Sequence, residues 1–150
     1  MNGTRVCIDE NVFLNVLNKE KAYLSYFREV LLASSKGNLE AIIPTLVISE
    51  VLTGSYIEKR KADAEEFLAA IVTHEHMKVI PLSMDIAVFS TIVRAKTGLK
   101  PPDAMILATA IENRTNYIVS SNENLPRPYE GVKTVKSVEI TKLMRGTMEV

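Results

Sequence analysis

The sequence predicts an α/β fold, a three-layer α/β/α sandwich around a central, mostly parallel sheet of four or five short strands. Short β-prone runs alternate along the chain with longer segments whose apolar residues recur at helical spacing. Parallel strands need crossover connections, and helices in those connections cover both faces of the sheet. We expect the 150 residues to form a single domain, 1–150, because the sequence contains no internal repeat or low-complexity linker.

The N-terminal part of the chain contains two of the expected strands. Arg5–Ile8 is a short, mostly apolar run that ends at Asp9, and apolar residues at helical spacing follow, so we expect a strand, a sharp turn and a helix. A second helix is predicted over Lys21–Lys36, where a glycine and an asparagine follow as a left-handed exit. Ala41–Ile43 is the next strand, and the helix after it is predicted over Pro44–Gly54.

The central part of the chain continues the alternation. Charged residues on one side and apolar residues on the other predict a helix over Lys59–Val72. Met77–Ile80 is the next β-prone run, and a proline bounds it. Ser83 can cap a helix that runs to about Thr97, and Gly98 is a natural stop for that helix.

The C-terminal part supplies the remaining elements. Pro101 and Pro102 open another helix, which leads into the β-prone run Tyr117–Val119. Val132–Val135 is a last short strand, and a final helix is expected over Ser137–Leu143. In parallel sheets of this kind ligands bind outside the carboxyl ends of the strands, so the residues that directly follow a strand are candidates for a site.

Composition and charge narrow the possible functions. The 18 basic and 18 acidic residues cancel, so any binding of nucleic acid must depend on local patches. Apolar residues make up 47% of the chain, which is typical of an ordered globular protein. The single cysteine, Cys7, excludes an internal disulfide and a multi-cysteine zinc site, and suits a reducing cytoplasm. No apolar run approaches the roughly 20 residues that cross a membrane, and no secretion signal is present, so we expect a soluble cytoplasmic protein.

Three acidic residues and one amide fall at positions where the predicted sheet would gather them. Asp9 follows the first strand, Glu50 lies in the helix after the second strand, Asp103 begins the helix before Tyr117, and Asn122 follows the strand that Tyr117 opens. Oxygen ligands of this kind suit Mg²⁺ or Mn²⁺, which keep waters for a substrate phosphate, so a phosphodiester is the expected substrate. Spacing alone leaves other readings open, because the three acids are equally well explained as a turn acid, a solvated helix residue and a helix cap.

The segments that carry these residues resemble the PIN-domain family, which includes the VapC-like toxin ribonucleases. Val6–Leu14 looks like the opening strand with its first metal-binding aspartate, and Pro44–Leu52 looks like the helix that carries the second acid. The most specific match is Leu99–Ala110, followed by Tyr117–Asn122. The resemblance covers Val6 to about Leu125, most of the chain, and implies a PIN-like fold.

The resemblance also implies a function and roles for individual residues. It implies a metal-dependent endoribonuclease with Asp9, Glu50 and Asp103 as catalytic, metal-binding acids and Mg²⁺ or Mn²⁺ as the cofactor. Asn11 would be a supporting polar group, and Ser120 would be the small hydroxyl residue before the fourth site position. PIN relatives commonly form homodimers, and the toxin branch is inhibited by a small antitoxin, so both partners are expected besides the RNA substrate.

One departure from the family pattern motivates alternatives. Asn122 stands where many PIN domains have a fourth acid, with Glu123 beside it as a possible substitute. The chain could therefore be a catalytically weak PIN domain that binds RNA or a protein, or a PIN nuclease of RNA processing. Arg94, Lys96 and Lys100 flank the loop that leads to the third acid and are candidates for guiding RNA phosphates, although ordinary surface charge explains them equally well.

Overall fold

The computed structural model describes residues 4–17, 39–126, 128–136 and 139. In this part of the chain a sheet of five strands has the order β3-β2-β1-β4-β5. The strands are β1 (Thr4–Ile8), β2 (Leu39–Pro44), β3 (Met77–Ile80), β4 (Tyr117–Val119) and β5 (Lys133–Val135). Every neighbouring pair is parallel, so the predicted sheet of short parallel strands is confirmed.

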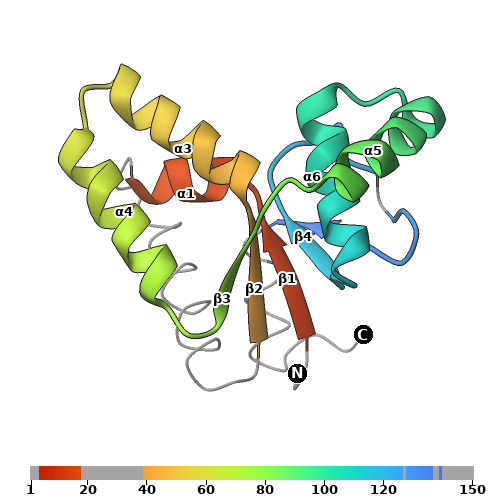
Figure 1. Cartoon of the computed structure of the whole chain (residues 1–150), viewed down its shortest axis with the longest axis horizontal. Helices are drawn as coiled ribbons and strands as arrows, with labels where there is room; N and C mark the ends of the chain where they lie inside the picture. Colours follow the sequence, from red (N-terminus) through yellow and green to blue (C-terminus); the bar gives the residue numbers. More distant parts are fainter. Residues whose placement is uncertain (1–3, 18–38, 127, 137–138, 140–150) are drawn as a thin grey trace.

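Helices connect the strands and form the outer layers. They are α1 (Glu10–Leu17), α3 (Thr45–Ile57), α4 (Lys61–Thr73), α5 (Met84–Thr97) and α6 (Pro101–Glu112). The helices α1 and α4 both pack on α3, and α5 packs on α6. Figure 1 shows the first group on one side of the strands and the second group on the other, which confirms the predicted three-layer arrangement. None of the described helices is both long enough and apolar enough to span a bilayer.

Two residues near α3 have roles that differ from those predicted. Pro44 is the last residue of β2 and not the first helical residue, because its φ of −62° is combined with an extended ψ of 141°. The helix then continues past Gly54. A Cβ atom at Gly54 would lie 3.0 Å from Leu14 Cδ2, so this glycine permits close packing of α1 on α3 and does not end the helix.

Other boundaries differ by one or two residues. The helix predicted over Lys59–Val72 begins later, as α4, because Lys59 has a left-handed φ of 59° that a helix does not accept. The strands β1 and β2 are longer than their predicted ranges, and β5 is shorter by its first predicted residue, Val132. The helices predicted over Lys21–Lys36 and Ser137–Leu143 lie outside the described residues.

The central strand, β1, positions the residues that follow it. Its residues 6–8 are at most 1% exposed and belong to the main hydrophobic core. The Asp9 amide donates a hydrogen bond to the Val119 carbonyl at 3.1 Å, so pairing with β4 continues into the turn. The Ser120 amide donates in the same way to the Val135 carbonyl at 3.0 Å. The residues after β1 and β4 are therefore fixed at one carboxyl edge of the sheet.

The packing of the sheet predicts a large cost for truncating its core. Ile118 of β4 is fully buried between Cys7 of β1 and Thr134 of β5. We expect Ile118→Ala to lower the free energy of unfolding by about 3 kcal/mol in urea titrations, because it removes buried methyl groups and leaves a cavity. The control Val72→Ala truncates a side chain that is 61% exposed and should change stability by less than about 0.5 kcal/mol. Equal effects of the two variants would contradict the assigned core.

Candidate active site

The Asp9 carboxylate is buried at the carboxyl edge of the sheet and is held by three hydrogen bonds. Its exposed fraction is 1%. Oδ1 accepts a bond from the Glu10 amide at 2.9 Å, and Oδ2 accepts bonds from Ser120 Oγ at 2.7 Å and from Asn11 Nδ2 at 3.3 Å. These donors, together with the Glu10 side chain that also hydrogen-bonds to Asp9, fix the orientation of the carboxylate.

Asn11 and Ser120, predicted as supporting residues, both contact Asp9 and also contact each other. Asn11 Nδ2 donates to Ser120 Oγ at 3.0 Å, and Asn11 Oδ1 accepts a bond from the Ser121 amide at 3.1 Å. Ser120 Oγ also accepts a bond from the Asn122 amide at 3.0 Å. These bonds join the first turn of α1 to the loop after β4.

Asn122 presents its amide nitrogen, and not its oxygen, to the third acid. Asn122 Nδ2 donates to Asp103 Oδ1 at 3.1 Å, and Asn122 Oδ1 accepts a bond from the Asn124 amide at 3.0 Å. The backbone donor at Asn124 fixes this orientation, because an amide turned the other way would place two donors against each other. Asn122 therefore binds Asp103 as a neutral donor in the structure.

Glu50 lies close enough to Asp9 and Asp103 for their charges to act on its carboxyl group. Burial, followed by the charges of Asp9 and Asp103, raises the pKa of Glu50. A hydrogen bond with Glu10 acts in the opposite direction, but Glu50 Oε1 is buried without a partner among the described residues. Glu50 therefore faces the same region as Asp9 and Asp103, although it comes from a different helix.

Glu10 belongs to this group and was not predicted as a site residue. Burial, followed by the hydrogen bond and the charge of Asp9 and then the charge of Glu50, raises the pKa of Glu10 to about 9. Glu10 is the first residue of α1 and lies immediately beyond the strand end. The rule that selected residues after strands would have found it if it had been extended by one position.

The acids lie close enough to interact through their charges, but the described side chains do not form a metal coordination site as they stand. In the described ranges no three Asp, Glu, His or Cys side chains are arranged to hold a metal ion as they stand. Glu123 is exposed and is not among the charges that raise the pKa of Glu50 or Glu10.

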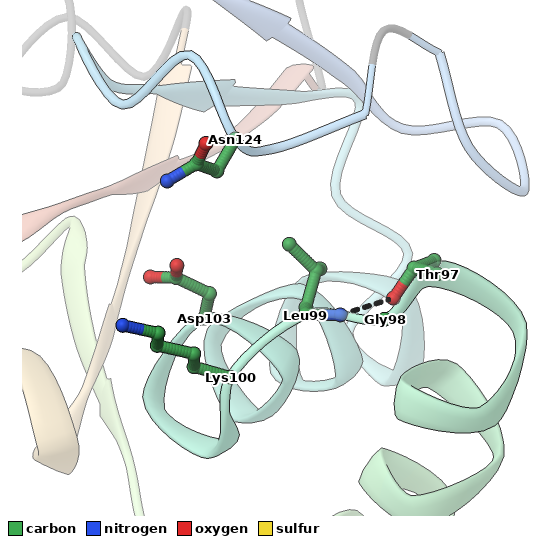
Figure 2. A pocket seen from close by; sticks show the side chains of 6 residues that line it. All are labelled: Thr97, Gly98, Leu99, Lys100, Asp103 and Asn124. Atoms are coloured by element: carbon green, nitrogen blue, oxygen red, sulfur yellow. Dashed lines mark hydrogen bonds between the residues drawn. The ribbon is translucent and has the colours of Figure 1, made fainter.

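The three basic residues that were predicted to guide RNA phosphates have different surroundings. Arg94 Nε donates to the Leu99 carbonyl at 3.2 Å and so holds the loop between α5 and α6. Lys96 is exposed on the last turn of α5. Lys100 lines a cavity of about 350 Å³ together with Asp103 (Figure 2). Of the three, Lys100 is the one that the structure brings to the acids.

Comparisons with known proteins agree on the fold. Residues 6–131 match the family model described as the PIN domain. Similar solved structures include VapBC2 from Rickettsia felis bound to promoter DNA (TM-score 0.65, 18% identity, covering 87% of this chain and 98% of that chain). A toxin-antitoxin complex from Klebsiella pneumoniae has a TM-score of 0.58 and 24% identity, covering 83% of this chain and 98% of that chain. VapC20 from Mycobacterium tuberculosis, described as a sarcin-ricin loop cleaving toxin, has a TM-score of 0.63 and 10% identity, covering 78% and 89%. No curated protein sequence gave a significant match.

The surroundings of two acids predict opposite effects of neutralising them. In excess chelator at neutral pH, Glu50→Gln should raise the melting temperature, because it relieves repulsion from Asp9 and Asp103. Asp9→Asn should lower the free energy of unfolding by about 1–3 kcal/mol, because each orientation of the new amide places a donor against donors from Glu10 or from Ser120 and Asn11. Scanning calorimetry of both variants checks the contrast, and shifts of the same sign would contradict it.

Proposed function

This chain belongs to the PIN-domain family, and from that premise we propose that it is a metal-dependent endoribonuclease that hydrolyses RNA phosphodiesters. The observation that best supports this is the proximity of three carboxylates: the charges of Asp9 and Asp103 both raise the pKa of Glu50. In addition, Glu50 Oε1 is buried without a hydrogen-bond partner among the described residues. A buried polar atom with no partner destabilises a protein, and a bound cation would supply the missing interaction. The like charges give the same requirement, because they would otherwise repel an RNA phosphate.

The residues at this edge of the sheet fit a hard divalent cation. PIN nucleases generally use a divalent metal, and the candidate ligands here are carboxylate oxygens, which suit Mg²⁺ or Mn²⁺. When bound, such an ion can polarise a phosphoryl oxygen and lower the pKa of a bound water. In this proposal Asp9, Glu50 and Asp103 are the acids that hold it.

The three acids are prepared for this role to different degrees. The Asp9 carboxylate is already oriented, because Ser120 Oγ and Asn11 Nδ2 both donate hydrogen bonds to its Oδ2. Asp103 is held on one oxygen by Asn122 and sits in the first turn of α6, whose following residues are buried. The free Oε1 of Glu50 leaves that side chain able to turn toward a cation. We therefore infer that Asp9 fixes the position of the ion and that Glu50 adjusts to it.

The biological setting proposed for this activity is a type II toxin-antitoxin pair. Similar folds have been solved as VapBC and other toxin-antitoxin complexes, and this supports a small antitoxin as a partner. A homodimer acting in the cytoplasm is part of the same proposal. A PIN nuclease of RNA processing remains the alternative setting.

A second candidate function rests on Asn122. With a neutral donor in the fourth position, the chain has one acid fewer than many PIN domains, and it could serve as an RNA- or protein-binding module with weak catalysis. The two functions differ in their need for metal. A binding module would retain its RNA or protein ligand equally well in chelator, whereas a nuclease would cleave RNA only when Mn²⁺ or Mg²⁺ is present.

Removal of the acids tests the nuclease proposal. The pair Asp9→Asn and Glu50→Gln should abolish Mn²⁺-dependent cleavage of a mixed RNA substrate, and Glu50→Gln alone should lower the rate by at least about a hundredfold. The matched control Glu65→Gln removes an exposed carboxylate of α4 and should cleave at the normal rate. Circular dichroism should confirm that the variants fold. Cleavage retained by the folded Glu50→Gln protein would contradict the assigned site.

Restoring an acid at the fourth position tests the role of Asn122. Asn122→Asp adds a carboxylate beside Asp103, so it should tighten Mn²⁺ binding by about one order of magnitude, the scale of a single supporting contact in metal sites. Titration calorimetry with Mn²⁺ measures this. Ser121→Asp adds the same charge at an exposed position of the same loop, outside the cavity, and controls for the general electrostatic effect. Unchanged affinity in Asn122→Asp, or equal gains in both variants, would refute a ligand role at this position.

A further inference from the structure

A cavity lies beside the acids, between the loop that joins α5 to α6 and the loop after β4. Its volume is about 350 Å³, within the range of about 300–1,000 Å³ that is usual for small-molecule sites. It is lined by Thr97, Gly98, Leu99, Lys100, Asp103 and Asn124. Because Asp103 belongs to both the cavity and the acid group, a ligand in the cavity would lie next to the proposed site of phosphodiester cleavage.

One wall of the cavity is held rigidly before any ligand arrives. The Gly98 amide donates to the Arg94 carbonyl at 2.8 Å, and the left-handed φ of 73° turns the chain sharply there. Thr97 Oγ1 accepts a bond from the Leu99 amide at 3.2 Å, which Figure 2 shows as a dashed line. Arg94 Nε holds the Leu99 carbonyl at 3.2 Å. Such a wall loses little conformational freedom on binding, which favours affinity.

The space above this wall is open. A Cβ atom built on Gly98 would have no other heavy atom within 4 Å. The Leu99 side chain belongs to the core and is 8% exposed, so only its outer edge forms the floor of that opening.

The polar groups of the cavity face one another across the gap. Figure 2 shows the Asn124 amide opposite Asp103 and Lys100. Within the described residues the Asn124 side chain makes no hydrogen bond, although its backbone amide donates to Asn122. A free amide offers both a donor and an acceptor, the combination that reads the polar edge of a nucleobase. The exposed Lys100 ammonium is suited to a phosphate.

We propose that this cavity binds the base of one unpaired RNA nucleotide next to the bond that is cut, and that Asn124 makes the binding selective for the base. The base occupies the open space above Gly98, Asn124 bonds to its edge, and Lys100 contacts the adjoining phosphate. Proteins read RNA sequence mainly on single-stranded, unstacked bases, so the substrate class is single-stranded RNA or a loop. The inference rests on the proposed ribonuclease function and adds the recognition of a flanking base to it.

Binding measured without cleavage tests this inference separately. Short fluorescent homopolymers of A, C, G and U are titrated with the full chain in excess chelator, and anisotropy gives the four affinities. The wild-type protein should prefer one base over the weakest by about tenfold, the discrimination expected of one well-placed pair of hydrogen bonds. Asn124→Ala should reduce that ratio to about twofold or less. The matched control Ser121→Ala alters an exposed side chain of the same loop outside the cavity and should keep the wild-type ratio.

Lysine variants separate phosphate contact from base recognition. Lys100→Gln should weaken binding of all four RNAs about equally and reduce the slope of log affinity against log salt by about 0.7, because one phosphate contact to a single strand is lost. The control Lys133→Gln alters an exposed lysine at the start of β5, at the opposite end of that strand from the acids, and should change the slope less.

Three results would overturn the inference. The first is the absence of base-dependent binding by the wild-type chain, including the absence of any RNA binding. The second is an unchanged preference in Asn124→Ala. The third is binding of free nucleoside monophosphates as tight as that of RNA, which would indicate a mononucleotide site. Failure of the nuclease proposal would be recognised independently, from the lack of Mn²⁺-dependent cleavage by the wild-type protein.

Discussion

The hydrogen bond from Ser120 Oγ to Asp9 Oδ2, 2.7 Å long, joins the ends of two adjacent parallel strands that are more than a hundred residues apart in sequence. Both residues are buried, so the bond is made where water does not compete for it. Asn11 bridges the same two residues and ties the start of α1 to the loop after β4. Through Ser120, which accepts a bond from the Asn122 amide, the same network reaches Asp103.

The cost of this arrangement is an accumulation of like charge. Burial and the neighbouring carboxylates raise the pKa values of Glu10 and Glu50, so the folded protein disfavours their ionised forms. Natural active sites often combine function with local destabilisation of this kind. Asn122 moderates the repulsion, because it adds a neutral donor to Asp103 where a fourth carboxylate would add charge.

The loop between α5 and α6 connects the acids to the cavity that we propose as a base-binding site. Its left-handed turn at Gly98 and the bonds of Arg94 and Thr97 hold a wall beside Asp103. The loop after β4 forms the opposite wall and carries Asn122 and Asn124. These two loops therefore link the proposed base-binding site to the acid group.

The sequence by itself determined the features that depend on neighbouring residues. The cap at Ser83, whose Oγ accepts a bond from the Ile86 amide, and the stop at Gly98 follow from short-range rules, as does the alternation of strands and helices. The rule for parallel sheets selected Asp9 and Asn122, which follow β1 and β4 at the carboxyl edge of the sheet. Local patterns contain the period, the caps and the turns, and these signals need no knowledge of distant partners.

Only the tertiary structure decided which side chains meet and which atoms they present to each other. It placed Glu10 between Asp9 and Glu50, turned the Asn122 nitrogen toward Asp103, and packed Gly54 against Leu14. Each of these contacts depends on the order of the strands, on helix packing or on competition among several hydrogen-bond donors. Such choices are made between residues that are distant in the chain, so no local pattern in the sequence encodes them.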